Sequence, residues 1–248
     1  MIAVVASELE SIIWFDGDAF PVLQPRCLME QTETGTLFFR DPYRLDAKNP
    51  IWAMMNRSEP ITGVSMESGM FFVNKSQKWR SLSVTAYMNQ RQKIYYQLLF
   101  GDKDTFFLSM ELMNESYTFV PYPMFLIGKM ADEIPRENPV KGDEFRGYIF
   151  FQPDMNGRPF CVHLTVGKDR TMSLLENGRR PFSTIMVYDA NYGHYHYEKK
   201  LWYRTVVVDE GEDNRRYIKT DVALGPFEKR FIVSYKKAKE LMSELGKV

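Results

Sequence analysis

Two aspartates close to each other at the end of an apolar run could bind a cation. Residues 12–22 read IIWFDGDAFPV, so only Gly17 separates Asp16 from Asp18. In an extended strand, residues i and i+2 point to the same face, so the two carboxylates would converge. Adjacent carboxylates repel unless a cation lies between them, and hard ions such as Mn²⁺ or Mg²⁺ take oxygen ligands. Because Asp-Gly is also a good turn sequence, a structural turn is the alternative.

Small residues occur beside these acids and beside a second acidic site. Gly17 carries no side chain, so a phosphate or a ribose could approach the backbone there. In residues 66–76, MESGMFFVNKS, the pair Ser68 and Gly69 precedes an apolar strand. Glu67 could then accept hydrogen bonds from the hydroxyls of a sugar lying against this backbone. A tight turn with an exposed acid is the alternative.

A third acidic site lies where a helix is predicted to begin, in YYQLLFGDKDTFFLSM. An aspartate at a helix N-cap accepts backbone N–H bonds and stabilises the helix by about 1 kcal/mol. This role explains one of Asp102 and Asp104 but not both. The second carboxylate is therefore a candidate for a binding cleft.

The histidines provide nitrogen ligands. His163 lies in the apolar run FCVHLTVGKDR, and Lys168 follows it after a glycine. Neutral imidazole is a common metal ligand, and a lysine nearby would meet phosphate oxygens. A hydrogen-bonded structural histidine is the alternative for His163. His194 and His196 have i, i+2 spacing, but their tyrosine-rich surroundings favour surface or packing roles.

Apolar runs and helical periodicity predict the elements that would position these residues. We expect strands at residues 12–15, 34–39, 69–74, 117–120, 147–151 and 160–166, and helices at 77–92 and 104–115. Strands that alternate with helices favour an α/β fold with a mixed or mainly parallel sheet.

Side-chain spacing predicts which helical faces are apolar. The expected apolar positions are Trp79, Leu82, Ala86 and Met88 in the first helix, Phe107, Met110, Leu112 and Met113 in the second, and Tyr235, Ala238, Leu241 and Leu245 in an amphipathic closing helix. Residues 130–145 are polar with two prolines and predict an exposed loop. Residues 152–159, which contain Asn-Gly, predict a turn between two strands.

Composition excludes several classes of function. The chain has 248 residues, 44% hydrophobic and 26% charged, which is ordinary for a globular protein. Lys+Arg and Asp+Glu are both 32, so no basic excess favours nucleic-acid binding. No apolar run approaches the roughly 20 residues that span a bilayer, and no targeting signal is evident. Cys27 and Cys161 are expected to remain unbridged and buried.

The order of these motifs resembles the fungal-type α-mannosyltransferases of the Golgi and, more loosely, the retaining glycosyltransferases with a GT-A fold. The motifs that carry the resemblance are WFDGDAFPV (14–22), TGTLFFRDPYR (34–44), NPIW (49–52), ESGMFFVNKSQKW (67–79), FGDKDTF (100–106) and FCVHLTVGK (160–168). Together they cover about residues 3–168 in order.

The resemblance implies a role for each candidate residue. Asp16 and Asp18 would bind Mn²⁺ (or Mg²⁺) and the diphosphate of GDP-mannose, with His163 as a third metal ligand. The donor sugar would lie against Glu67, Ser68 and Gly69, and the diphosphate would contact Lys168. Asp102 and Asp104 would lie near the anomeric carbon or the acceptor hydroxyl.

The implied function is mannose transfer from GDP-mannose to an α-mannoside acceptor with retention, in glycan synthesis in the Golgi. The implied fold is a GT-A-like mixed sheet flanked by helices. Only about a dozen residues precede the Asp-x-Asp strand, so we expect the first nucleotide-binding strands of the family to be missing. We expect one partial domain over 1–248, with a catalytic core portion at 1–176 and a C-terminal extension at 177–248. The alternatives are a non-catalytic glycan- or partner-binding relative and a transferase that uses a UDP-sugar.

Overall fold

The computed structural model describes most of the first two thirds of the chain and separate strands beyond it. The described residues are 2–41, 45–57, 61, 65–122, 124–130, 145–157, 159–164, 184–188, 206–210 and 215–219, with single positions 233, 236, 237, 240, 241 and 243. Helices and strands occur together, which confirms the expected α/β class.

The chain folds into two compact units, each with more contacts within itself than with the other. The first consists of Met1–Gly17, Gln24–Met124 and Asp154–Asn156, and the second of Asp18–Leu23, Phe125–Pro153 and Gly157–Val248. These units do not test the expected division into a core at 1–176 and an extension at 177–248, which stays a prediction.

The first unit contains a three-stranded sheet in the order β1-β4-β3. Its strands are β1 (Ser11–Phe15), β3 (Thr36–Arg40) and β4 (Met66–Asn74). Both neighbours of β4 are antiparallel to it. The central strand β4 is almost entirely buried, which fits its continuous apolar run.

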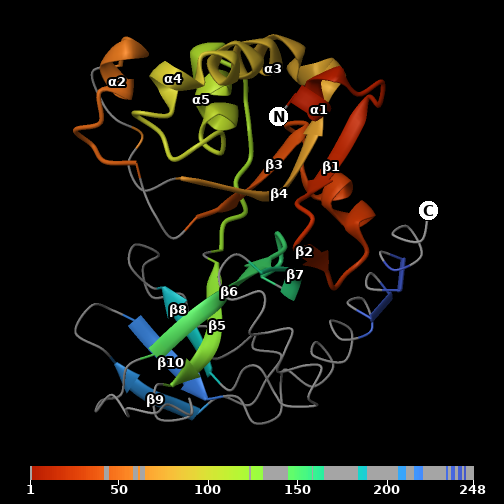
Figure 1. Ribbon diagram of the computed structural model, residues 1–248, viewed down its shortest axis with the longest axis vertical. Helices are drawn as coiled ribbons and strands as arrows, with labels where there is room; N and C mark the ends of the chain where they lie inside the picture. Colours follow the sequence, from red (N-terminus) through yellow and green to blue (C-terminus); the bar gives the residue numbers. More distant parts are fainter. Residues whose placement is uncertain are drawn as a thin grey trace. The chain divides into compact units, whose positions relative to one another are not determined.

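Helices accompany this sheet in the first unit (Figure 1). They are α1 (Ile2–Ala6), the 3₁₀ helix η1 (Pro25–Gln31), α2 (Ile51–Met54), α3 (Lys75–Gln90), α4 (Gln92–Tyr95) and α5 (Thr105–Leu112). The Asn74 side chain caps α3 by accepting a hydrogen bond from the Gln77 N–H at 3.2 Å. The predicted helices at 77–92 and 104–115 are therefore confirmed as α3 and α5.

The inner face of α3 differs from the expected apolar face. Trp79 is 52% exposed, whereas Leu82 and Met88 are buried as expected. The buried stripe also includes Ser81 and Thr85. The Ser81 hydroxyl donates to the Glu115 carboxylate, and the Thr85 hydroxyl pairs with the Ser109 hydroxyl of α5, each at 2.5 Å. Hydroxyl pairing between two helices is invisible to a pattern that counts only apolar residues.

Aromatic side chains form the core between the sheet and α5. Phe71 of β4 and Phe106 of α5 pack with ring centroids 4.5 Å apart, and Phe38 of β3 lies 6.4 Å from Phe106. All three are at most 2% exposed. Burial of such large apolar surfaces provides most of the favourable free energy of folding.

The second unit contains a seven-stranded sheet in the order β2-β7-β6-β5-β8-β10-β9 (Figure 1). Its strands are β2 (Ala19–Pro21), β5 (Phe125–Met130), β6 (Phe145–Pro153), β7 (Pro159–His163), β8 (Thr184–Tyr188), β9 (Val206–Glu210) and β10 (Arg215–Lys219). The strands predicted at 147–151 and 160–166 are confirmed as β6 and β7. Gly157, with φ 74°, lies in the predicted connection between them.

Strand direction differs from the expectation of a mixed or mainly parallel sheet. Every described pair of strands is antiparallel, and the only parallel contact among the described residues is an isolated bridge between Phe38 and Phe119. That bridge replaces the strand predicted at 117–120. A short turn such as that between β6 and β7 can only join antiparallel neighbours, whereas an apolar run alone does not encode direction.

Other expectations are tested only in part. Most of the predicted loop at 130–145 lies outside the described residues, as do Tyr235, Ala238 and Leu245 of the closing helix. Leu241 is helical and 50% exposed. Cys161 is buried and Cys27 is half-buried, and the two are not joined in a disulfide.

Candidate functional site

The Asp-Gly-Asp sequence forms the connection between β1 and β2. The strand β1 ends at Phe15, and Gly17 and Asp18 adopt a turn, which confirms the turn interpretation. The argument from strand faces therefore does not apply, since both aspartates lie beyond the strand. The turn itself does not exclude a ligand, because turn carboxylates are often accessible.

Asp16 belongs to the first unit and is anchored there by two hydrogen bonds. Its backbone N–H donates to the Gly69 carbonyl at 2.8 Å, and its carboxylate accepts the indole N–H of Trp14 at 2.8 Å. The carboxylate is half-buried. The first aspartate of the motif is thus tied directly to the strand β4.

Asp18 and His163 meet within the second unit. Ala19 pairs with His163 across β2 and β7, and the Leu164 N–H donates to the Asp18 carbonyl at 2.9 Å. This pairing brings Nε2 of His163 to 3.2 Å from Oδ1 of Asp18, with side-chain exposures of 9% and 19%. An imidazole nitrogen and a carboxylate oxygen at this spacing are suitable ligands for one divalent ion.

The spacing of these two atoms fits an octahedral ion. Ligands at about 2.1 Å from a metal lie about 3 Å apart on neighbouring vertices of an octahedron, close to the 3.2 Å observed between Asp18 and His163. The assignment of Asp16, Asp18 and His163 to one metal ion stays a prediction.

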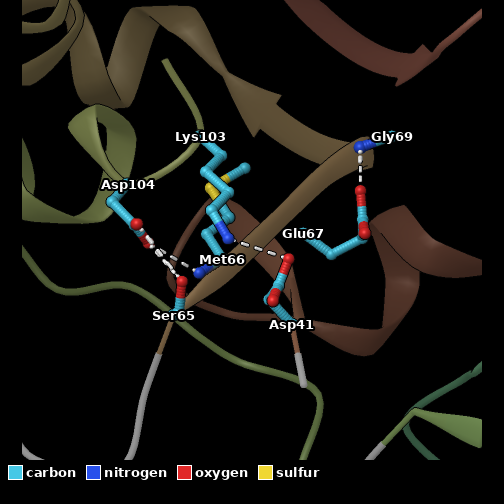
Figure 2. Close-up of polar contacts among 7 residues, drawn as sticks. All are labelled: Asp41, Ser65, Met66, Glu67, Gly69, Lys103 and Asp104. Carbon is cyan, nitrogen blue, oxygen red and sulfur yellow. Dashed lines mark hydrogen bonds and ion pairs between the residues drawn. The ribbon is translucent and has the colours of Figure 1, made fainter. Parts of the chain in front are cut away.

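Glu67 and Gly69 lie in an irregular part of β4. Phe38 of β3 pairs with Phe71, but the next residue, Phe39, pairs with Glu67, so the register shifts between them. Glu67 is 5% exposed, and its carboxylate accepts the Gly69 N–H at 2.7 Å (Figure 2). The alternative of a tight turn with an exposed acid is therefore wrong. Ser68 is half-buried within the same segment.

Asp104 is the N-cap residue of α5, yet its side chain does not cap the helix. Oδ1 instead accepts the Met66 N–H at 2.8 Å and the Ser65 hydroxyl at 2.9 Å (Figure 2). The residue is 0% exposed. Burial raises the pKa of the Asp104 carboxyl, while the Met66 N–H, the Lys103 ammonium and the Ser65 hydroxyl act in the opposite direction.

Asp102 differs from its neighbour in the same motif. Its carbonyl accepts the Thr105 N–H at 3.0 Å, and the residue is half-buried rather than fully buried. The carboxylate also contributes to raising the pKa of Tyr96, after the larger effect of burial on that phenol. Of the two aspartates, Asp102 is therefore the more accessible.

An ion pair that the motif analysis did not predict lies beside Asp104. Nζ of Lys103 is 2.9 Å from the carboxylate of Asp41, with side-chain exposures of 10% and 7%. The Asp41 N–H also donates to the Ser65 carbonyl at 2.9 Å. Asp41 lies in the motif at 34–44 and Lys103 in the motif at 100–106. Their opposite charges were the one feature of the sequence that could have suggested this pair.

The NPIW motif has a structural role. The Asn49 side chain donates to the Leu98 carbonyl at 2.6 Å and accepts the Ile51 N–H at 2.9 Å. The Trp52 indole donates to the Asp46 carbonyl at 2.8 Å. These bonds fix the start of α2 against the segment that leads to residues 100–106. Lys168, His194 and His196 lie outside the described residues.

Residues 49–154 match the model of a protein family described as "Mannosyltransferase putative". No curated protein matches the chain significantly. This match supports a relationship to mannosyltransferases and, in general, a role in mannosyl transfer. Such a role implies sugar substrates.

Only some of the candidate residues lie within the matched range. Residues 65–69 and 100–106 lie inside it, whereas Asp16, Asp18 and His163 lie outside. None of the helices in the described part of the chain has the length and apolar character of a membrane span.

Proposed function

We propose that the chain acts as a metal-dependent retaining α-mannosyltransferase with a GT-A-like fold, transferring mannose from GDP-mannose to an α-mannoside acceptor in Golgi glycan synthesis. The match of residues 49–154 to a mannosyltransferase family is the observation that carries this proposal. The order of the motifs on both sides of the match supports the finer assignments.

Asp16, Asp18 and His163 would hold the divalent cation, Mn²⁺ or Mg²⁺. The contact between Asp18 and His163 at 3.2 Å supports this assignment, because it brings an oxygen and a nitrogen, both common metal ligands, close together. When bound, the cation would stabilise the negative charge that develops on the departing diphosphate. Lys168 would add a positive charge near the same phosphates.

The donor would lie along the backbone of β4 and of the Asp-Gly-Asp turn. A Cβ atom on Gly17 would meet no atom within 4 Å, so there is open space on that side of the turn. Ser68 is half-buried at the irregular part of β4, and Gly69, next in the chain, has no side chain. Glu67 shapes this segment through its bond to the Gly69 N–H.

The reaction breaks the bond between carbon one of mannose and the phosphate oxygen, which keeps the electron pair. An acceptor hydroxyl then forms a new bond to carbon one and gives its proton to an oxygen of the departing diphosphate. A carboxylate near carbon one stabilises the positive charge that develops there. The half-buried Asp102 is the more accessible candidate for this role, whereas Asp104 is fully buried.

Thermal unfolding with GDP and Mn²⁺ tests the proposal. We expect the two ligands together to raise the Tm of the wild type, since ligands that bind only the folded state stabilise it. Asp16→Ala with Asp18→Ala should abolish the shift. Glu8→Ala with Glu33→Ala removes two exposed carboxylates elsewhere and is the matched control. No shift in the wild type would contradict metal-dependent donor binding.

A transfer assay separates the remaining functions. We expect labelled mannose to pass from GDP-mannose to an α-mannoside only when Mn²⁺ or Mg²⁺ is present. Transfer from a UDP-sugar instead would reassign the donor. Glycan binding that is indifferent to Mn²⁺ and to Asp16 and Asp18, without transfer, would favour a non-catalytic relative.

A further inference from the structure

Four residues of the first unit close a ring of polar contacts around the start of β4. The Asp41 N–H donates to the Ser65 carbonyl at 2.9 Å, and the Ser65 hydroxyl donates to the Asp104 carboxylate at 2.9 Å. Lys103 precedes Asp104 in the chain, and its Nζ lies 2.9 Å from the Asp41 carboxylate. Figure 2 shows the Ser65–Asp104 bonds and the Lys103–Asp41 ion pair side by side.

The ring is almost completely removed from solvent. Ser65 is 2% exposed, Lys103 8% and Asp104 0%. Buried charges are costly unless they are paired and hydrogen-bonded, and removing one partner leaves the others uncompensated. We therefore expect these four residues to be held rigidly in the observed arrangement.

Hydrogen bonds and one peptide bond, between Met66 and Glu67, lead from this ring to the proposed donor segment. Asp104 accepts the N–H of Met66, the first residue of β4. Next in the strand, Glu67 accepts the Gly69 N–H at 2.7 Å. The Gly69 carbonyl in turn accepts the Asp16 N–H at 2.8 Å.

We propose that Asp41, Ser65, Lys103 and Asp104 are positioning residues that fix residues 67–69 in the form that receives the donor sugar. The donor part of this inference rests on the proposed function. In this role Asp104 acts through Met66 and Ser65 and does not touch the substrate. Contact with the reacting sugar is left to Asp102.

Amide hydrogen exchange in the ligand-free protein tests the positioning itself. We expect Ser65→Ala and Lys103→Met each to speed exchange at the Met66 and Gly69 amides at least about tenfold, while amides within α3 keep their rates. Ser83→Ala removes an exposed hydroxyl that donates to the Trp79 carbonyl, and it should change neither amide. An unchanged Gly69 rate, or equal acceleration at all amides, would overturn the proposal.

Calorimetry in the presence of Mn²⁺ tests the link to the donor. We expect Lys103→Met to leave the Kd for GDP within about twofold while the additional affinity for GDP-mannose over GDP falls about tenfold. Equal weakening of both ligands, or of neither, would overturn the link to the sugar. A wild type that binds neither ligand would overturn the proposed function instead, and the exchange rates would still decide whether the ring fixes residues 67–69.

Discussion

Asp18 and Asp104 are both aspartates of short acidic motifs, yet the two units surround them differently. Asp18 lies in a turn, has a side chain 19% exposed and lies beside the imidazole of His163. Asp104 is 0% exposed and accepts hydrogen bonds from Ser65 and Met66. An acidic motif therefore indicates where carboxylates gather, but burial decides whether they can reach a ligand.

The comparison separates two kinds of function. A partly exposed carboxylate beside an imidazole can bind a cation together with that imidazole, with little disturbance of the core. A buried carboxylate that satisfies a backbone N–H and a hydroxyl cannot leave them without a large cost. We therefore expect substitutions of Asp18 to affect ligands, and substitutions of Asp104 to affect folding.

The largest expected effect is that of Asp104→Ala on stability. Removal of the carboxylate leaves the Met66 N–H and the Ser65 hydroxyl buried and without their acceptor, next to the Lys103 ammonium. The free energy of unfolding should fall by about 3 kcal/mol. Asp18→Ala should lower it by about 1 kcal/mol, because the Asp18 side chain is 19% exposed and water can replace it beside His163. Urea-induced unfolding followed by tryptophan fluorescence measures both, and equal losses would contradict the comparison.

The ion pair beside Asp104 provides a second test. Lys103→Met removes the ammonium 2.9 Å from the Asp41 carboxylate, and we expect the free energy of unfolding to fall by about 2 kcal/mol. The pair between Arg57 and Glu111 is the matched control, since the Arg57 side chain is 36% exposed. Arg57→Met should cost less than about 1 kcal/mol in the same urea titration.

A double-mutant cycle sharpens this result. If Asp41 and Lys103 act as a pair, the combination of Asp41→Ala and Lys103→Met should cost less than the sum of the single changes. Additive losses would mean that the two side chains are buried side by side without depending on each other.

The pH dependence of stability tests the burial of the Asp104 carboxyl without removing the side chain. Because burial raises its pKa in the folded state, the folded protein holds this proton more tightly than the unfolded chain. The stabilisation is complete below the unfolded pKa and is lost as the pH rises through the raised folded pKa. The loss amounts to about 1.4 kcal/mol per unit of difference between the two pKa values.

Unfolding of the wild type and Asp104→Asn at a series of pH values isolates this contribution. We expect the stability of the wild type relative to the variant to fall as the pH rises across that window, since Asn does not titrate. A constant difference between the two proteins would contradict the raised pKa.

The sequence predicted the elements whose signals are local. The strands β1, β3, β4, β6 and β7 and the helices α3 and α5 follow from apolar runs and helical periodicity, which depend only on neighbouring residues. Strand direction depends on which distant strands meet, so the antiparallel pairing of both sheets could not be read from those runs.

The same distinction between local and long-range information applies to the candidate site. The motifs located Asp104 and Glu67, but not their burial, because burial is set by residues elsewhere in the chain. The pair between Asp41 and Lys103 joins two motifs far apart in sequence, so only the folded chain reveals it. The contact between Asp18 and His163 likewise needs the pairing of β2 with β7.

The smallest expected effects distinguish the glycines beside the two acidic motifs. Gly101 has φ +78°, a conformation that side chains rarely adopt, so Gly101→Ala should lower the free energy of unfolding by about 1 kcal/mol. Gly17 lies outside that region, and a Cβ there meets no atom within 4 Å, so Gly17→Ala should change stability by less than about 0.5 kcal/mol.

A methyl group on Gly17 should nevertheless weaken the binding of GDP with Mn²⁺ if a phosphate approaches this backbone. Thermal unfolding with and without the two ligands measures both quantities in one experiment. If Gly17→Ala keeps normal stability and the ligands raise its Tm as much as they raise that of the wild type, no phosphate lies against the turn. The same substitution with a reduced rise would show that the open side of the turn is used by the ligand, because the folded chain alone gives the methyl group nothing to collide with.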